Sequence, residues 1–198
     1  MIILGLTGGM GAGKGYVSAI FAEHGIQSID TDKVSRQVCE PGSACLEELR
    51  AAFGEGILLP DGTLDRRALA SLAFADEAST ALLNAVTHKH ILAVCKSWLA
   101  EREVSGDFAA ILDAPLLYES KFNCICDFVI AVLADLPLRV SRAVRRDNTT
   151  EEAVMARIAR QHTNEFFRSR ADYIIYNNES SNVRAQVDLI MQQLRFRG

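Results

Sequence analysis

Short apolar segments rich in β-branched and aromatic residues recur along the chain, and longer segments with helical periodicity separate them. Alternating strand and helix signals of this kind are typical of a parallel sheet covered by helices on both faces. We therefore predict an α/β fold. The predicted strands are Ile2 to Thr7, Ile26 to Asp30, Phe108 to Asp113, Phe128 to Leu133 and Tyr173 to Tyr176.

A helical insertion is predicted between the second and third strands. The stretch from Pro60 to Gly106 has no convincing strand pattern, and it shows helix start signals at Thr63 and Asp76. No repeat, low-complexity tract or linker interrupts the chain, and its 198 residues suit one hydrophobic core. We predict a single domain that carries this insertion.

Composition excludes several function classes. The chain has 21 Lys and Arg against 25 Asp and Glu, and its net charge of -4 argues against a general nucleic-acid binder. Its five cysteines include no CxxC pair, which fits neither a disulfide framework nor a thiolate zinc site and indicates the reducing cytoplasm. No apolar run reaches the roughly 20 residues that span a bilayer. We expect neither nucleic acid nor membrane as a partner, and no pattern indicates an oligomeric state.

The clearest chemical motif directly follows the first predicted strand and reads Gly8-Gly9-Met10-Gly11-Ala12-Gly13-Lys14. It matches the P-loop pattern G-x-x-x-x-G-K-[ST] up to the lysine, and a predicted helix follows it. Glycines let the backbone approach a ligand closely, amides and the helix N-terminus attract phosphate oxygens, and the lysine reaches the β- and γ-phosphates. The alternative is a glycine-rich turn with a solvated lysine, and the flanking strand and helix favour the phosphate-binding loop.

The next position of the motif departs from the pattern, because Gly15 stands where a Ser or Thr hydroxyl binds Mg²⁺. Phosphate binding by backbone amides does not need that hydroxyl. Either a water molecule replaces the missing metal ligand, or the site is degenerate.

Acidic residues follow two other predicted strands, at the sheet edge where the P-loop is expected. Asp30 and Asp32 follow the second strand. Asp32 is placed to orient or deprotonate an attacking hydroxyl or to cap a helix that begins at Lys33, and the two roles are compatible. Asp113 ends the third strand, where it either holds Mg²⁺ through water or ends the strand before a proline turn.

A basic cluster occupies residues 135–170, with eight arginines against five acidic residues. Arg142, Arg145 and Arg146 share one face of a predicted helix, where their guanidinium groups match phosphate oxygens. The alternative is that these arginines form a solvent-exposed helix face and pair with nearby acidic side chains. Because the cluster accompanies a P-loop, we expect at least one of these arginines to act on phosphate. The same four-residue spacing recurs in Arg157 and Gln161 on the next predicted helix.

Further motifs stand beside these: LTGGMGAGKG, IDTD with RQV and EPG, DGTLDRR, DAPLLYE, RAVRRD, RIARQ, and ADYII with NN. Together they resemble the dephospho-CoA kinase family from residue 4 to about residue 195. The resemblance implies a P-loop kinase-like three-layer fold with a five-stranded parallel sheet, a helical acceptor-binding insertion and an arginine-bearing lid. It implies a core of about residues 1–59, 107–138 and 171–198, a CoA-binding insertion of about 60–106 and a lid of about 139–170.

The resemblance also implies a reaction, the transfer of the γ-phosphoryl group of Mg-ATP to the ribose 3′-hydroxyl of dephospho-CoA, which completes coenzyme A synthesis. ATP and Mg²⁺ are the implied cofactors. Gly15 departs from the family's usual hydroxyl residue, and Lys89 replaces the proline usual after His88, which we expect to be structural. One alternative is another P-loop small-molecule or nucleotide kinase. The other is a degenerate nucleotide-binding protein, and Gly15 is the only residue that supports it.

The expected site residues form three groups. The catalytic residues are Lys14, Asp32 and Arg142, with Asp32 as the base or orienting group. Asp113 is the metal-binding residue. The nucleotide-binding residues are Gly9, Gly11, Ala12, Gly13, Lys14, Gly15, Tyr16, Arg142 and Arg146.

Overall fold

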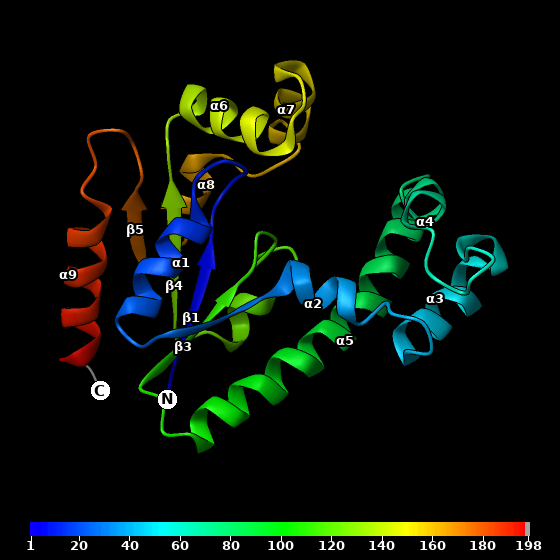
Figure 1. The fold of residues 1–198 in the computed structure, drawn as a ribbon, viewed down its shortest axis with the longest axis horizontal. Helices are drawn as coiled ribbons and strands as arrows, with labels where there is room; N and C mark the ends of the chain where they lie inside the picture. Colours follow the sequence, from blue (N-terminus) through cyan, green and yellow to red (C-terminus); the bar gives the residue numbers. More distant parts are fainter. Residues whose placement is uncertain (197–198) are drawn as a thin grey trace. The chain divides into compact units, whose positions relative to one another are not determined.

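The structure is a computed structural model that describes residues 1–196, drawn as a ribbon in Figure 1. Its contacts divide the chain into two compact units. The first unit comprises Met1–Ile29 and the described chain from Glu101 onward, and the second comprises Asp30–Ala100. In the sequence, the second unit is therefore an insertion into the first.

A five-stranded sheet forms the centre of the first unit. Strand β1 pairs in parallel with β3 and β4, and β4 pairs in parallel with β5. The predicted α/β fold with a five-stranded parallel sheet is confirmed, and β1, β4 and β5 have the predicted bounds. The strands are β1 (Ile2–Thr7), β2 (Gln27–Asp30), β3 (Ala109–Asp113), β4 (Phe128–Leu133) and β5 (Tyr173–Tyr176), in the order β2-β3-β1-β4-β5.

Helices of the first unit cover both faces of this sheet (Figure 1). Ile130 and Val132 of β4 pack with α1 and α9 on one face, and Ala131 and Leu133 pack with Phe167 of α8 on the other. Burial on both faces explains why β4 is a continuous apolar run, whereas β2 at the edge of the sheet is polar and partly exposed. The helices are α1 (Lys14–Glu23), α6 (Leu136–Asp147), α7 (Glu151–Ile158), α8 (Asn164–Arg168) and α9 (Val183–Arg195), with a 3₁₀ turn η2 at Phe122–Ile125.

The second unit is almost entirely helical, and it is longer than the insertion expected at residues 60–106. Two helices precede that stretch, because Asp30 caps α2 and the Ser43 hydroxyl caps α3 by accepting a hydrogen bond from the Leu46 amide. The unit contains α2 (Thr31–Gln37), α3 (Ala44–Phe53), a 3₁₀ turn η1 at Glu55–Ile57, α4 (Arg66–Ala73) and most of α5 (Glu77–Val104).

The helix start predicted at Thr63 is wrong, because α4 begins at Arg66. The backbone amide and the hydroxyl of Thr63 both donate to Asp61 Oδ1, at 2.9 and 2.6 Å, and close a turn. A side chain that bonds its neighbouring backbone in this way competes with helix formation. Asp65 provides the cap of α4 instead.

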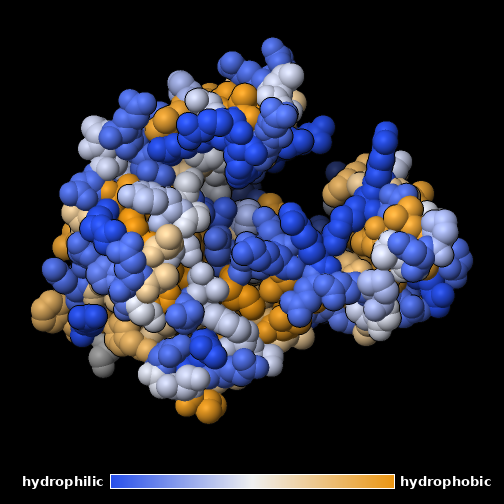
Figure 2. Space-filling model, in the orientation of Figure 1, coloured by the Kyte–Doolittle hydropathy of each residue, from blue (hydrophilic) through white to orange (hydrophobic). Residues whose placement is uncertain are grey.

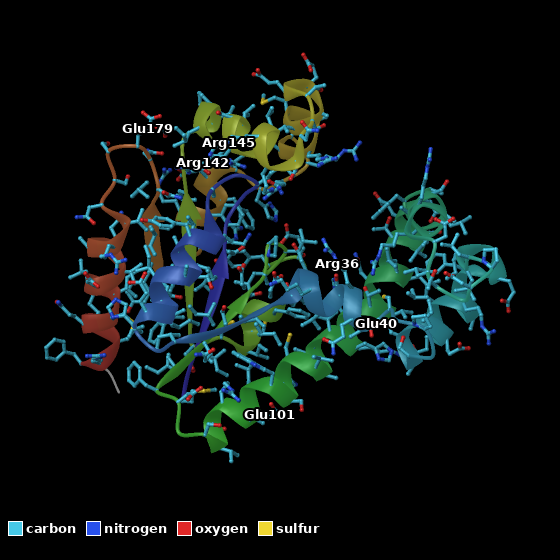
Figure 3. All side chains as sticks on the ribbon, viewed as in Figure 1. Arg36, Glu40, Glu101, Arg142, Arg145 and Glu179 are labelled. Carbon is cyan, nitrogen blue, oxygen red and sulfur yellow. The ribbon has the colours of Figure 1, made fainter. Side chains whose placement is uncertain are left out.

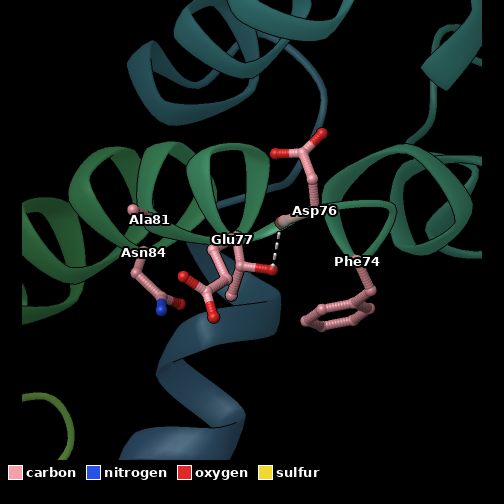
Figure 4. Close-up of a pocket in the computed structure, with 6 residues that line it drawn as sticks. Phe74, Asp76, Glu77, Ala81 and Asn84 are labelled. Atoms are coloured by element: carbon pink, nitrogen blue, oxygen red, sulfur yellow. Dashed lines mark hydrogen bonds between the residues drawn. The ribbon is translucent and has the colours of Figure 1, made fainter.

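The helix start predicted at Asp76 is confirmed, because α5 begins at Glu77 and the Asp76 carboxylate accepts a hydrogen bond of 2.7 Å from the Ser79 amide. Figure 4 shows a pocket at this junction of α4 and α5. Two carboxylates line it, which makes it unfavourable for a phosphate group. The lining residues are Phe74, Asp76, Glu77, Thr80, Ala81 and Asn84.

Hydrophilic residues dominate the face of the molecule that Figure 2 shows, and apolar residues form small separate patches on it. Large apolar side chains are exposed singly, as at Phe74 and Val104. Across residues 1–196, the helices lack the combination of length and apolar composition that crossing a membrane requires.

Candidate active site

The predicted P-loop connects β1 to α1 in the strand-loop-helix order expected from the sequence. Gly11 and Gly13 have φ angles of +74° and +96°, in the left-handed region that residues with a Cβ rarely adopt. Gly13 is the N-cap of α1, and Lys14 is the first residue of that helix. The glycines therefore allow the backbone to turn sharply into the N-terminus of α1.

Backbone amides at the start of α1 are available to a ligand. Within residues 1–196, the amides of Gly13, Lys14 and Gly15 donate no hydrogen bond to another protein group. The first amides of a helix carry a partial positive charge when they lack partners. Together with the Lys14 ammonium group, they form a site suited to phosphate oxygens.

Three side chains from distant parts of the chain hold the backbone of this loop. The amide of Met10 donates to Gln161 Oε1 at 2.8 Å, and Arg139 Nε donates to the carbonyl oxygen of Met10 at 2.9 Å. Asn177 Nδ2 donates to the carbonyl oxygen of Ala12 at 2.8 Å. Each bond satisfies a backbone group that a compact loop would otherwise leave without a partner.

The same contacts explain the glycines of the motif. A Cβ on Gly9 would lie 2.2 Å from Arg139 Nη2, and a Cβ on Gly13 would lie 2.1 Å from Asn177 Nδ2. A Cβ on Gly11 would lie 2.1 Å from the carbonyl oxygen of Arg139. Gly9 has an ordinary φ angle, so packing against the Arg139 guanidinium group is what favours glycine there.

Lys14 and Asp113 lie close together, as the sequence predicted for residues at this edge of the sheet. Asp113 ends β3 beside Leu6 of β1, and its Oδ1 lies 3.8 Å from Lys14 Nζ. Both side chains are largely buried, with 17% and 16% of their surface exposed. The Asp113 carboxylate therefore lies at the edge of the sheet next to the P-loop lysine.

Gly15 differs from the other glycines of the motif. A Cβ at this position would meet no atom within 4 Å, and its φ angle is ordinary. Neither backbone conformation nor packing requires glycine here, so a hydroxyl residue would fit. Tyr16 follows it in the first turn of α1 and is exposed.

Arg142 lies beside the P-loop. Its Nη1 donates to the carbonyl oxygen of Asn177 at 3.0 Å and lies 3.8 Å from the position of a Cβ on Gly13. Arg142 and Arg145 both come from α6 (Figure 3), and Arg142 is half-buried whereas Arg145 is exposed. The structure thus places one arginine of the predicted cluster next to the phosphate-binding loop.

Arg146 is exposed and binds Asp147 through two hydrogen bonds of 2.7 and 3.0 Å. The Arg146 guanidinium holds the pKa of the Asp147 carboxyl below its usual range, and Arg157 adds a bond of 3.4 Å. Gln161 lies beyond α7, which ends at Ile158, so placing it on one helix with Arg157 was wrong. A turn closed by the Gln161 amide on the Ile158 carbonyl oxygen frees its side chain to reach the P-loop.

Asp30, and not Asp32, caps the helix after β2. Asp30 Oδ1 accepts hydrogen bonds from the amides of Asp32 and Lys33, at 2.9 and 3.2 Å. The cap predicted for Asp32 was therefore wrong, because α2 begins at Thr31, two residues before the predicted start. Asp32 is exposed in the first turn of α2, and its carboxylate accepts no hydrogen bond within residues 1–196.

Arg139, Gln161 and Asn177 were not among the expected site residues, although all three hold the P-loop. For Asn177, a signal was present, because it directly follows β5 at the edge where Asp113 ends β3. Arg139 gave no comparable signal, since it was one of eight arginines in residues 135–170. Only the contacts across the fold distinguish it from the others.

Comparison with known proteins identifies the family. The family model for dephospho-CoA kinase matches residues 2–182. A dephospho-CoA kinase of Corynebacterium efficiens is 40% identical over 195 residues, which are 98% of each chain. TT1252 from Thermus thermophilus has a TM-score of 0.83 at 30% identity, covering 99% of this chain and 97% of that one.

A structure of dephospho-CoA kinase from Campylobacter jejuni shares the fold, with a TM-score of 0.70 at 24% identity over 97% of this chain and 96% of that one. The family match extends over most of the chain, and the relative from Corynebacterium matches almost end to end. The chain belongs to the dephospho-CoA kinase family, whose members transfer a phosphoryl group to dephospho-CoA.

Proposed function

We propose that this chain transfers the γ-phosphoryl group of ATP to the ribose 3′-hydroxyl of dephospho-CoA. In this reaction the hydroxyl oxygen forms a bond to the γ-phosphorus, the bond from that phosphorus to the ADP oxygen breaks, and the hydroxyl proton leaves to a base. The observation that carries the proposal is the P-loop with free amides and with Lys14 beside Asp113. The five free cysteines support the reducing cytoplasm as its place of action.

In this proposal the loop holds the phosphates of ATP. The left-handed glycines Gly11 and Gly13 turn the backbone into the N-terminus of α1, where free amides bind phosphate oxygens, and Lys14 contacts the β- and γ-phosphates. Gly9 allows the loop to pack on Arg139. Within the described residues, the Gly15 amide is free in the first turn of α1, whereas the amides of Ala12 and Tyr16 already donate to the carbonyl oxygens of Gly9 and Gly13 and shape the loop. Binding by backbone amides is tolerant of side-chain identity, which agrees with the presence of Gly15.

Arg142 is proposed to neutralise charge on the transferring phosphoryl group. Its support is the contact with Asn177, whose side chain holds the P-loop, and its short distance to Gly13. A planar guanidinium group at that position fits two phosphate oxygens. For Arg146 to take a similar role, its hydrogen bonds to Asp147 would have to break and its guanidinium group would have to bind the nucleotide instead. Residues 139–170, which include α7 and α8, are proposed as the lid.

Asp32 is proposed to orient or deprotonate the ribose hydroxyl. Its support is the exposed carboxylate, which is not used in capping because Asp30 provides the cap. The second unit, with Asp32 in its first helix, is proposed to bind the acceptor.

The site residues fit Mg²⁺ in its usual mode in kinases. Mg²⁺ takes few protein ligands, often one carboxylate, and completes its octahedron with waters and substrate phosphates. Asp113 supplies such a carboxylate next to Lys14. When bound with ATP, the ion neutralises negative charge on the β- and γ-phosphates.

We expect Gly15→Ser to lower the Mg²⁺ concentration for half-maximal activity by roughly tenfold, within the range of a supporting group at a metal site. The side chain fits without a clash, and its hydroxyl supplies the ligand that glycine lacks. The measurement is a Mg²⁺ titration of activity at fixed ATP. Gly15→Ala is the matched control, because it adds the Cβ without the hydroxyl. Superimposable curves for the Ser and Ala variants would refute this role of position 15.

The proposed function is tested by incubating purified protein with Mg-ATP and dephospho-CoA. We expect a product heavier by one phosphate group, detected by mass spectrometry, and little reaction with a panel of nucleoside monophosphates. A Lys14→Met variant prepared in parallel controls for a contaminating kinase. No product at saturating metal and substrates would favour a degenerate nucleotide-binding protein, and faster turnover of a nucleoside monophosphate would favour a nucleotide kinase.

A further inference from the structure

Arg139 brings a positive charge into the interior of the first unit. Among residues 1–196, it is the only charged residue that is fully buried, with 5% of its surface exposed. Burial lowers the pKa of its guanidinium group, yet arginine keeps its charge in folded proteins. A charge in this position destabilises the folded chain unless another charge compensates it.

The polar partners of this guanidinium group are neutral. Nε donates to the carbonyl oxygen of Met10 at 2.9 Å, and Nη1 donates to Asn164 Oδ1 at 3.5 Å. Nη2 is inaccessible to solvent and has no hydrogen-bond acceptor within the described chain. No carboxylate of residues 1–196 pairs with Arg139, so the protein itself supplies no compensating charge.

Arg139 is packed directly against the P-loop. Its Nη2 lies 2.2 Å from the position of a Cβ on Gly9, and its backbone carbonyl oxygen lies 2.1 Å from that of a Cβ on Gly11. The Met10 side chain packs against a small apolar cluster formed by α6 and α7, which includes Val140 and Val154. The first half of the loop and Arg139 therefore form one closely packed element.

We infer that Arg139 is a positioning residue of the P-loop, and that the phosphates of the bound nucleotide compensate its buried charge in place of a protein carboxylate. The inference rests on the proposed function, because it requires polyphosphate to bind at this loop. Interaction between charges is stronger in the interior than in water, and salt screens it less. Polyphosphate binding should therefore depend on the charge at position 139, although the guanidinium group is covered by the loop.

Thermal unfolding and calorimetry separate this role from a purely structural one. Wild type and Arg139→Met are compared without ligand, with ATP and with inorganic triphosphate. We expect Arg139→Met without ligand to melt near the wild-type temperature, because removal of an uncompensated buried charge offsets the loss of its hydrogen bond to the Met10 carbonyl oxygen. We expect its Kd for both ligands to rise by roughly 5-fold to 150-fold, the usual range of coupling between two sites. The control is Arg195→Met, which removes an exposed positive charge from α9 and should bind as wild type does.

A lower melting temperature without ligand together with an unchanged Kd would show a structural role and overturn the inference. If Arg139→Met fails to fold, Arg139→Lys and Arg139→Gln make the same comparison, because lysine keeps the charge and glutamine removes it. We then expect tighter binding by the lysine variant, and equal Kd values would overturn the inference. A wild-type protein that binds neither ATP nor triphosphate would overturn the proposed function itself, and the inference with it.

Discussion

Asp32→Asn should lower kcat by roughly 10² to 10⁴-fold, the usual range for loss of a general acid-base group. Asparagine keeps the size and one oxygen of the side chain but cannot accept the proton of the ribose hydroxyl. The fold should be preserved, because the cap of α2 is Asp30 and the Asp32 side chain takes no part in it. The Kd for ATP should change little. Steady-state kinetics with dephospho-CoA, combined with calorimetric ATP binding, measures both quantities.

Asp30→Asn is the matched control for this experiment. Asparagine caps helices about as well as aspartate, so the variant should retain α2 and keep most of its activity. Near-normal turnover of Asp32→Asn would contradict the proposed role, and a large loss in Asp30→Asn alone would assign the base to Asp30. Loss in both variants with weakened ATP binding would indicate damage to the fold.

Gly13→Ala should lower kcat/KM by at least about 10²-fold, because a displacement near 1 Å in a catalytic site has an effect of this size. Gly13 has a φ angle of +96°, and an added Cβ would lie 2.1 Å from Asn177 Nδ2. The loop or Asn177 must move, which changes the amides and the contact of Asn177 with Arg142. ATP binding by calorimetry and kcat/KM should fall together.

Gly25→Ala separates this local effect from general backbone strain. Gly25 has a φ angle of +80°, but a Cβ there would meet no atom within 4 Å. Both variants place alanine in the left-handed region, at a cost of roughly 1–2 kcal/mol in stability. Only Gly13→Ala should lose more kcat/KM than the fraction of unfolded protein accounts for. Equal kinetic losses in the two variants would contradict a specific role for packing at Gly13.

Local pattern was sufficient to predict the strands and the loop. The predicted bounds of β1 and β4 are correct because these strands are buried on both faces, and such strands appear in the sequence as predominantly apolar runs. The P-loop was recognisable because its conformation depends on glycines, which permit φ angles closed to other residues. Lys14 and Asp113 meet because parallel strands present their carboxyl ends at one edge.

Helix starts were less predictable, because several polar residues near a boundary compete to accept hydrogen bonds from the first amides. Asp30 caps α2 in place of Asp32, and Thr63 closes a turn with Asp61 instead of starting α4. Both outcomes depend on which side chain reaches the amides once the backbone has turned. Because α2 begins two residues earlier than predicted, Asp30 and not Asp32 is its cap.

The sequence by itself therefore determined the α/β class, the phosphate-binding loop and the acids that follow the strands, since each depends on residues close together along the chain. Only the tertiary structure decided which distant side chains hold that loop. Arg139, Gln161 and Asn177 lie more than 120 residues from Met10 and Ala12, and of the three only Asn177, which directly follows β5, has a local signal for its position. Their roles arise because folding brings α6, the chain after α7 and the end of β5 together, where the buried backbone of the loop requires hydrogen-bond partners.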